Sequence, residues 1–192
     1  CSCGPSQSAG SCCGPADDSE TFSKVSKLYQ DPDVAALPEE VTEISLGCGD
    51  PVTLASLKPG QTVLDLGSGG GIDCFLAAKK VGPTGKVIGV DMTAAMIERA
   101  RANKAKLNAE NVEFRLGEIE HLPVADHGVD VIISNCVINL SSDKPQVLRE
   151  AFRVLKPGGK LAVSDIVTDG PLPDVVKNSL SAWAGCVAGA LD

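Results

Sequence analysis

The sequence lacks three features that would point to particular partners or chemistry. It has no run of 18 apolar residues and no secretory signal pattern, so we expect a soluble, cytoplasmic protein without a membrane span. Basic residues are outnumbered by acidic ones, 17 to 25, and the net charge of −8 disfavours nucleic acid as a partner. Histidine occurs only at His121 and His127, both near turns and expected to be exposed, so no histidine–cysteine catalytic pair is predicted.

A glycine-rich stretch is what the rest of the chain is organised around. The apolar run Thr62–Leu66 predicts a strand, the turn with Gly67, Gly69 and Gly71 follows, and a helical apolar pattern comes next. Glycines let the backbone approach a ligand closely, and the new helix offers it unpaired N–H groups. The dinucleotide-binding spacing G-x-G-x-x-G is not met, because Ile72 stands where the third glycine belongs. A tight strand–helix connection without a ligand is the alternative.

The glycines fit another pattern, acidic-x-Gly-x-Gly-x-Gly, which here begins at Asp65 and continues with Gly67, Gly69 and Gly71. In this pattern the chain resembles class I methyltransferases that use S-adenosylmethionine (SAM). The resemblance implies a carboxylate at the strand end and a close-lying backbone for a ligand that carries a cationic methionine end and a ribose.

Further candidates for the cofactor site follow the next two predicted strands. Asp91 ends the strand Lys86–Asp91, 26 residues after Asp65, and is the candidate for binding the ribose hydroxyls. In the resembling family the next position, Met92, packs on the adenine; a buried methionine at a helix start is the alternative. Glu118 and Ile119 follow the third strand, where such enzymes place an acid and a backbone N–H against the adenine edge.

Strand and helix patterns alternate along the chain, and 192 residues suffice for one α/β domain. We predict a class I methyltransferase fold, a Rossmann-like open and mostly parallel sheet of strand order 3-2-1-4-5. The remaining predictions are strands at Val129–Cys136 and Lys160–Asp165, helices at Thr93–Asn108 and Asp143–Leu155, and a turn at Lys156–Gly159.

Composition and the resemblance together predict three regions. Residues 1–18 form a flexible cysteine-rich tail, residues 19–170 the SAM-binding methyltransferase domain, and residues 171–192 the start of a substrate-binding region. The stretch 17–46 reads as mostly helical, as in the lids of many methyltransferases. The chain starts with Cys1 rather than Met and lacks the antiparallel strand pair that ends this fold, so we expect missing ends, with truncation at the C-terminus.

Cysteine is abundant, with eight residues. In an α/β chain without an export signal, thiol chemistry explains them better than a disulfide framework. Cys136 follows a central strand at its carboxyl end, where ligands bind in open α/β sheets. Cys48, between two glycines, is expected to be accessible, with a passive thiol in a turn as the alternative, and Cys74 is expected to be packed. The tail cysteines either bind a soft ion or are simply exposed and oxidisable.

Three cysteine-containing segments, Leu46–Pro51, Ile133–Leu140 and Trp183–Leu191, together resemble arsenite methyltransferases. The resemblance implies arsenite and methylarsenite as small-molecule substrates, SAM as methyl donor, and Cys136, Cys186 and Cys48 as thiols at the arsenic site. Soft trivalent arsenic prefers thiolate ligands, and its lone pair can attack the methyl group of SAM. Trp183 and Cys186 are predicted to share one helical face.

A redox step also follows, because methyl transfer formally leaves pentavalent arsenic. A cysteine pair can return two electrons by forming a disulfide, which a thiol reductant such as glutathione or thioredoxin then reduces. Cys48 is the predicted participant, and the family implies a partner nearer the amino terminus. No cysteine lies between Gly14 and Gly47, so Cys12 and Cys13 are open candidates.

Two rival functions use part of this pattern. A SAM-dependent methyltransferase for another small molecule, such as a quinone or a phenol, would be indifferent to Cys136 and Cys186. A metalloid sensor or carrier would bind arsenite without using SAM. Neither uses the glycine loop and the three thiols together.

Overall fold

The computed structural model describes residues 34, 37, 41, 48–184 and 186–190. The predicted tail lies outside the described residues, as does most of the predicted helical lid. Within that stretch Val34, Leu37 and Val41 are described, and all three are buried in the core.

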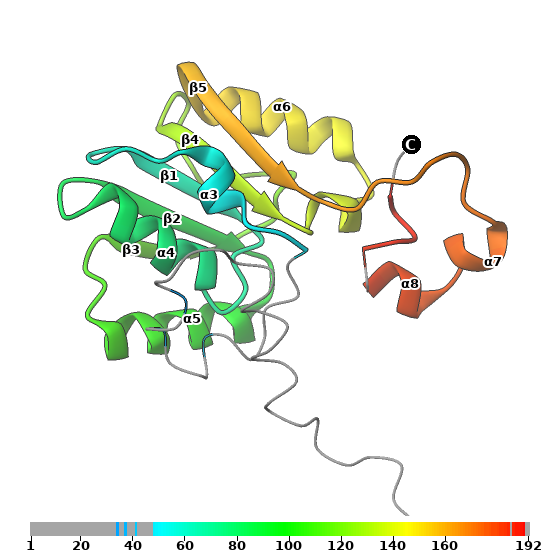
Figure 1. Ribbon diagram of the computed structural model, residues 1–192, viewed down its shortest axis with the longest axis horizontal. Coiled ribbons are helices and arrows are strands. Elements are labelled where there is room, and N and C mark those ends of the chain that lie inside the picture. Colours follow the sequence, from blue (N-terminus) through cyan, green and yellow to red (C-terminus); the bar gives the residue numbers. More distant parts are fainter. Residues whose placement is uncertain (1–33, 35–36, 38–40, 42–47, 185, 191–192) are drawn as a thin grey trace, which may run out of the picture.

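A parallel sheet of five strands forms the centre of the molecule, in the predicted order β3-β2-β1-β4-β5 (Figure 1). The strands are β1 (Thr62–Leu66), β2 (Lys86–Asp91), β3 (Val112–Leu116), β4 (Val129–Asn135) and β5 (Leu155–Ser164). Every neighbouring pair runs parallel. The two central strands are buried on both faces, as continuous apolar runs in parallel sheets are. The carboxyl ends of all five strands therefore meet at one edge, where β1 and β4 are neighbours.

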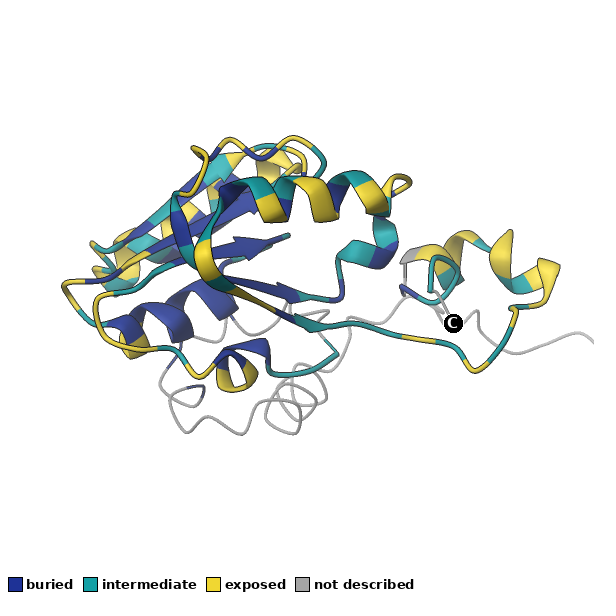
Figure 2. Ribbon diagram, turned by 90° about the horizontal axis from the view of Figure 1, so that it is seen from above, coloured by how far each residue is buried: buried dark blue, intermediate teal, exposed yellow. Residues whose placement is uncertain are grey.

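Helices cover both faces of the sheet, and each face has its own core cluster (Figure 2). Val63 and Leu64, which are adjacent in β1, belong to opposite clusters because successive side chains of a strand point to opposite faces. One cluster includes residues of α3 (Pro51–Ala55), α4 (Ile72–Val81) and α5 (Ala94–Leu107), and the other includes residues of α6 (Lys144–Val154). The molecule is a three-layer α/β sandwich.

The structure corrects two predictions about elements and adds one helix. The five-residue helix α3 was not predicted. The predicted turn at Lys156–Gly159 lies within β5, where pairing passes from Leu155 opposite Val129 to Lys160 opposite Val131, so these four residues form an irregularity in the strand. The helix predicted to present Cys186 ends earlier, since α8 spans Leu180–Ala184.

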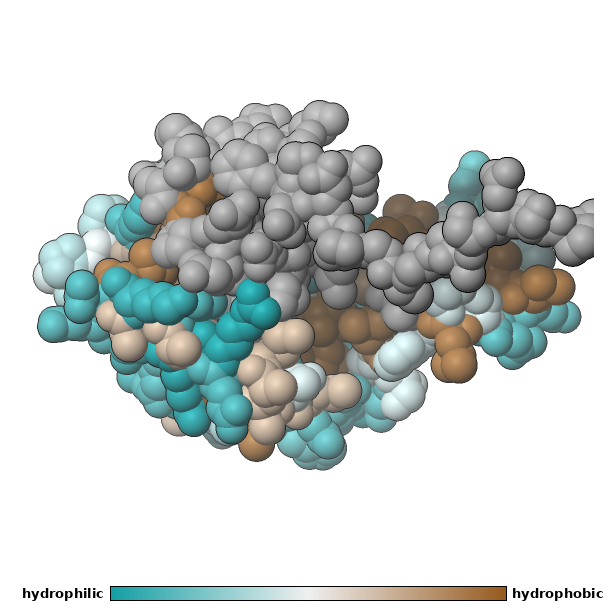
Figure 3. Space-filling model, turned by 90° about the horizontal axis from the view of Figure 1, so that it is seen from below, coloured by the Kyte–Doolittle hydropathy of each residue, from teal (hydrophilic) through white to brown (hydrophobic). Residues whose placement is uncertain are grey.

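After β5 the chain leaves the sheet, forms α7 (Asp174–Lys177) and α8, and returns to the carboxyl edge at Cys186 (Figure 1). Figure 3 shows hydrophobic side chains at this end of the molecule, and four that are exposed on this segment are Val167, Val175, Leu180 and Trp183. None of the described helices is long and apolar enough to cross a membrane.

Candidate functional site

The glycines of the loop after β1 serve different purposes. Gly67 has φ +67°, and a Cβ there would lie 2.5 Å from Val137 Cγ2; Gly71 has φ +97°, and a Cβ would lie 2.8 Å from the Phe114 ring. Both positions therefore need glycine for packing and for backbone conformation. A Cβ on Gly69, at φ +49°, would meet no atom of the described residues within 4 Å. The loop thus presents its backbone at Gly69 to open space.

Asp91 and Asn103 hold this loop in place. Asp91 ends β2, and its carboxylate accepts hydrogen bonds from the Gly69 N–H at 3.0 Å and the Thr93 N–H at 2.8 Å. Asn103, a buried residue of α5, donates from Nδ2 to the Gly70 carbonyl at 3.1 Å. Sequence reasoning missed Asn103, although an asparagine at an apolar helix position is a signal that could have been used. The loop conformation is therefore fixed by side chains from two other elements.

The other cofactor candidates lie around Asp91. Met92 is 72% exposed, so the alternative of a buried methionine is wrong. The Gly117 N–H donates to the Asp91 carbonyl at 3.0 Å, which brings the turn after β3 to the end of β2. In that turn the Glu118 side chain is exposed and Ile119 is buried. The structure thus gathers the predicted residues at the carboxyl ends of β1, β2 and β3.

Asp65 sits beneath the loop as a buried carboxyl. It is 2% exposed, and the Cys74 thiol donates to its Oδ2 at 3.2 Å. Burial and then the neighbouring carboxylate of Asp73 raise the pKa of Asp65 well above its ordinary value. Burial and the charge of Asp65 likewise raise the pKa of Cys74, which keeps its proton and acts as the donor. Cys74 is packed, as predicted, whereas the second buried acid, Asp73, was not singled out from the sequence.

Asp65→Asn is expected to stabilise the chain by about 1 kcal/mol at pH 7, because a neutral amide avoids burying a charge while still accepting from Cys74. The folded chain holds the Asp65 proton to a higher pH than the unfolded chain, so this carboxyl lowers stability as pH rises above its ordinary pKa of 3.8. The gain from the substitution should therefore disappear below that pH. Urea unfolding at several pH values measures it.

The exposed carboxylate of Asp169 offers the control for this measurement. Asp169→Asn should change stability by less than about 0.5 kcal/mol at any pH. A loss of stability in Asp65→Asn at pH 7, or a gain that does not depend on pH, would contradict the argument.

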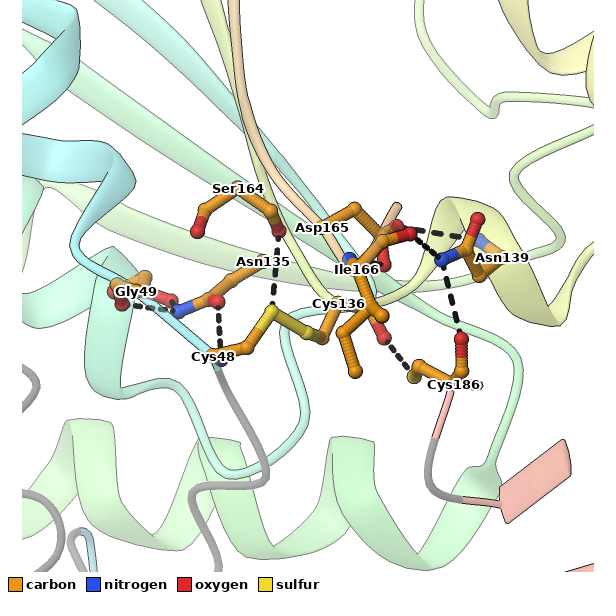
Figure 4. Close-up of a disulfide and its surroundings, with 10 residues drawn as sticks. Cys48, Gly49, Asn135, Cys136, Asn139, Ser164, Asp165, Ile166 and Cys186 are labelled. Atoms are coloured by element: carbon orange, nitrogen blue, oxygen red, sulfur yellow. Dashed lines mark hydrogen bonds between the residues drawn. A yellow bond between two sulfur atoms is a disulfide. The ribbon is translucent and has the colours of Figure 1, made fainter. Parts of the chain in front are cut away.

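The three predicted thiols meet at the carboxyl ends of β4 and β5 (Figure 4). Cys48 and Cys136 form a disulfide across a sequence separation of 88 residues, with their Cα atoms 5.9 Å apart. Cys48 is half-buried and Cys136 buried. The expectation that Cys48 pairs with a cysteine nearer the amino terminus is therefore not met in this structure; Cys12 and Cys13 lie outside the described residues.

Cys186 lies against Cys136 from the far end of the chain. Its thiol donates to the Cys136 carbonyl at 2.7 Å, and it is 5% exposed, whereas Trp183 is 45% exposed. The prediction that Trp183 and Cys186 share a helical face is thus wrong, because α8 ends before Cys186. Burial and then the negative charge of Asp165 raise the pKa of Cys186. Cys136 and Cys186 both have positive φ values, +54° and +60°.

Polar residues around the thiols were not identified from the sequence. A carboxylate oxygen of Asp165 and the sulfurs of Cys48 and Cys136 all lie within 4.8 Å of one another. Asn135 and Asn139, on either side of Cys136, are hydrogen-bonded to the segments that carry Cys48 and Cys186. The signal that could have found them is two asparagines within four residues of a cysteine in an otherwise apolar stretch. Once reduced, the two sulfurs and the carboxylate form a donor set for a thiophilic centre.

The glycine loop lies next to the segment that carries Cys136. A Cβ on Gly67 would lie 2.5 Å from Cγ2 of Val137, the residue after Cys136, so this side chain is a direct neighbour of the loop. The glycine loop after β1 and the cysteines at the ends of β4 and β5 are therefore neighbours at the carboxyl edge of the sheet.

Comparison with known proteins places this geometry in a family. A family model described as "Methyltransferase domain" matches residues 57–192. The arsenite methyltransferase of Halobacterium salinarum is 54% identical over 94% of this chain and 46% of its own length. The human arsenite methyltransferase is 41% identical over 80% of this chain and 43% of its own length. The chain thus spans about half the length of the curated relatives it matches.

The solved structures agree with the sequence relatives. The crystal structure of CrArsM, an arsenic(III) S-adenosylmethionine methyltransferase from Chlamydomonas reinhardtii, matches with a TM-score of 0.75 and 44% identity, over 85% of this chain and 58% of that one. A SAM-dependent methyltransferase from Aquifex aeolicus matches with a TM-score of 0.59 and 33% identity, over 79% of this chain and 78% of that one. With its five-stranded sheet in the order 3-2-1-4-5, the chain belongs to the methyltransferase domain family and has the class I, Rossmann-like fold.

Proposed function

We propose that this chain carries the site at which a methyl group passes from SAM to trivalent arsenic held by cysteine thiolates. The observation that carries the proposal is the meeting of Cys48, Cys136 and Cys186, from three distant segments, beside the glycine loop. A methyltransferase for an organic acceptor needs no such cluster. The similarity to arsenite methyltransferases of Halobacterium salinarum and of human supports the same substrate.

The residues at the ends of β1, β2 and β3 fit SAM. The open space at Gly69 and the exposed Met92 leave room for a flat ligand, and the Asp91 carboxylate keeps lone pairs for ribose hydroxyls. The proposed binding set is Asp65, Gly67, Gly69, Gly71, Asp91, Met92, Glu118 and Ile119. When bound, SAM supplies a methyl group on a positively charged sulfur. The residues of the chain bind it, orient it and exclude water.

The thiols hold and orient the substrate. Arsenite and methylarsenite exchange hydroxyl groups for sulfur, and each hydroxyl leaves as water with the proton of a thiol. Cys136 and Cys186 are the proposed ligands, with Cys48 as the third thiol. The arsenic lone pair forms the new As–C bond while the S–CH₃ bonding electrons stay on the donor's sulfur, so the substrate needs no general base. The work of the site is alignment.

The disulfide suggests which two cysteines take part in the redox step. Methylated arsenic is formally pentavalent, and oxidation of two thiols to one disulfide returns two electrons to it and releases two protons. We assign that role to Cys48 with Cys136, which the structure joins. Two thiols of glutathione, or a thioredoxin dithiol, would then reduce the disulfide and become oxidised themselves. In this scheme residues 171–192 belong to the substrate-binding region because they contribute Cys186, and residues 19–170 to the SAM-binding domain.

The reaction should depend on a reductant at its first turnover as well as later ones. The disulfide occupies the Cys136 sulfur, so chain isolated without reductant should neither bind arsenite nor methylate it. After treatment with glutathione or with thioredoxin and its reductase, methylated arsenic should appear. Incubation with SAM and arsenite, followed by chromatography of the arsenic species, measures both states.

The same incubation separates the alternatives. A reduced chain that binds SAM but methylates a quinone or a phenol and leaves arsenite unchanged would overturn the arsenic substrate. Arsenite binding without SAM binding would instead indicate a carrier. This chain spans about half the length of its relatives. The rate of arsenite methylation should therefore also be measured on a longer chain that contains these residues.

A further inference from the structure

Two asparagines flank Cys136, and their side chains bond to the segments that carry Cys48 and Cys186 (Figure 4). Asn135 is the last residue of β4, and Asn139 lies in the 3-10 turn η2 (Ile138–Leu140). Both side chains bond to the main chain of segments far away in the sequence, and each of those segments carries one of the other two thiols. Cys136 therefore lies between two asparagines, whose amides bond to the segments that carry Cys48 and Cys186.

Asn135 holds the Cys48 segment. Its Oδ1 accepts the Cys48 N–H at 3.0 Å, and its Nδ2 donates to the Gly49 carbonyl at 3.0 Å and to the buried Asp73 carboxylate at 3.1 Å. The amide thus satisfies a donor and an acceptor of the Cys48–Gly49 backbone at once, as a neighbouring strand would. A side chain with only acceptors or only donors could not make this pair of bonds.

Asn139 holds the Cys186 segment. Its side chain is buried at 6% exposure, and Nδ2 donates to the Cys186 carbonyl at 3.1 Å and to the Ile166 carbonyl at 2.6 Å. Its own N–H donates to the Asp165 carboxylate at 3.2 Å. A Cβ on Gly189 would collide with the Asn139 carbonyl, so the chain after Cys186 also lies directly on this residue.

We infer that Asn135 and Asn139 are positioning residues that set Cys48 and Cys186 on opposite sides of Cys136 and so assemble the three-thiol site. The chain reaches Cys186 through α7 and α8, which lie outside the sheet, so local bonds must fix the thiol (Figure 1). The Asn139 amide and the thiol's own bond to the Cys136 carbonyl supply them. The geometric part of this inference stands on the structure, and its catalytic meaning rests on the proposed function.

The geometric part is tested by thiol alkylation of the reduced chain, read residue by residue by mass spectrometry. Asn139→Ala and Asn139→Asp should expose Cys186 and speed its alkylation about tenfold, since each removes both donated bonds. Asn139→Asp has nearly the same shape but turns a donor into an acceptor facing two carbonyls. Asn135→Ala should act on Cys48 and leave Cys186 protected. The buried Cys74 is the internal standard, and Asn178→Ala, at an exposed asparagine of the same C-terminal segment, is the control.

Gly189→Ala gives a second route to the same result if the Asn139 variants fold poorly. The added methyl group would push the Cys186 segment away from the Asn139 carbonyl without altering any core residue. Faster alkylation of Cys186 is again expected. Wild-type protection of Cys186 in both Gly189→Ala and a folded Asn139 variant would overturn the inference.

Arsenite titration supplies the functional readout. The single tryptophan, Trp183, accepts the Cys186 N–H through its carbonyl at 2.9 Å, so its fluorescence should report binding at Cys186. Asn139→Asp should weaken arsenite binding about 10- to 100-fold and leave SAM affinity unchanged. If wild type fails to bind arsenite while the alkylation pattern is as expected, the proposed function fails and the positioning role stands. If wild type binds arsenite and the Asn139 variants bind it equally well, the positioning role fails.

Discussion

Replacing Cys136 with serine is expected to reduce the rate of arsenite methylation at least 100-fold, while SAM still binds. Loss of a residue that only supports a ligand typically costs about 10- to 100-fold, and loss of a ligand itself should cost at least as much. Serine keeps the shape, but its oxygen is hard and does not ionise near neutral pH, so it is a poor ligand for soft trivalent arsenic. The loss should be large because Cys136 has two proposed roles, as ligand and as disulfide partner of Cys48. Single-turnover methyl transfer in the presence of reductant measures the rate, and calorimetry measures SAM affinity.

The control for this variant is the same exchange at a cysteine to which the proposal assigns no role. Cys3→Ser, outside the described residues, should methylate arsenite at the wild-type rate. A Cys136→Ser chain that turns over at a similar rate would remove Cys136 from the ligand set, and with it the sulfur-centred proposal.

The second large effect is a contrast between two alanine substitutions in the glycine loop. Gly71→Ala should destabilise the chain by about 3 kcal/mol, because the methyl group meets the Phe75 and Phe114 rings and φ is +97°. Gly69→Ala should cost only about 1 kcal/mol of backbone strain, since no atom in the described part of the chain lies within 4 Å of the added methyl group. Its methyl group would instead occupy the space proposed for SAM and weaken SAM binding about tenfold or more.

Urea unfolding and SAM titration of the two variants measure this contrast. Gly71→Ala should lose mainly stability, and Gly69→Ala should lose mainly affinity. Equal SAM affinity in Gly69→Ala and wild type would show that the open side of the loop is not where SAM lies.

Most of the fold could be predicted from the sequence. The bounds of β1 and β2 are those predicted from Thr62–Leu66 and Lys86–Asp91, because strands buried on both faces read as apolar runs closed by turn residues. Short elements were the exception. The helix α3 has only five residues and too few positions to show a period, although Asp50 as N-cap and Pro51 at its start are the signals that mark it.

The site could be predicted only in part. Glycine spacing and strand ends identified the loop and Asp91, since both are local patterns. The Cys48–Cys136 bond, the Asn103 contact and the amide hydrogen bonds of Asn135 and Asn139 join segments between 33 and 88 residues apart. Such contacts depend on which distant segments the folded chain brings together at the carboxyl edge of the sheet, and neither periodicity nor spacing encodes that. The helical face predicted for Trp183 and Cys186 was wrong, because α8 ends at Ala184 and the Cys186 thiol bonds to the distant Cys136 carbonyl.

The positive φ values of Cys136 and Cys186 have a consequence for directed evolution. A residue with a Cβ pays roughly 1 kcal/mol for the left-handed region, and glycine adopts it freely. A variant library sorted for thermal stability alone, with reductant present so that the Cys48–Cys136 disulfide adds nothing, should therefore enrich glycine at both positions and lose the sulfurs before the fold weakens. Selection for thermal stability would favour glycine at these two positions, and selection for binding of thiophilic substrates would favour cysteine.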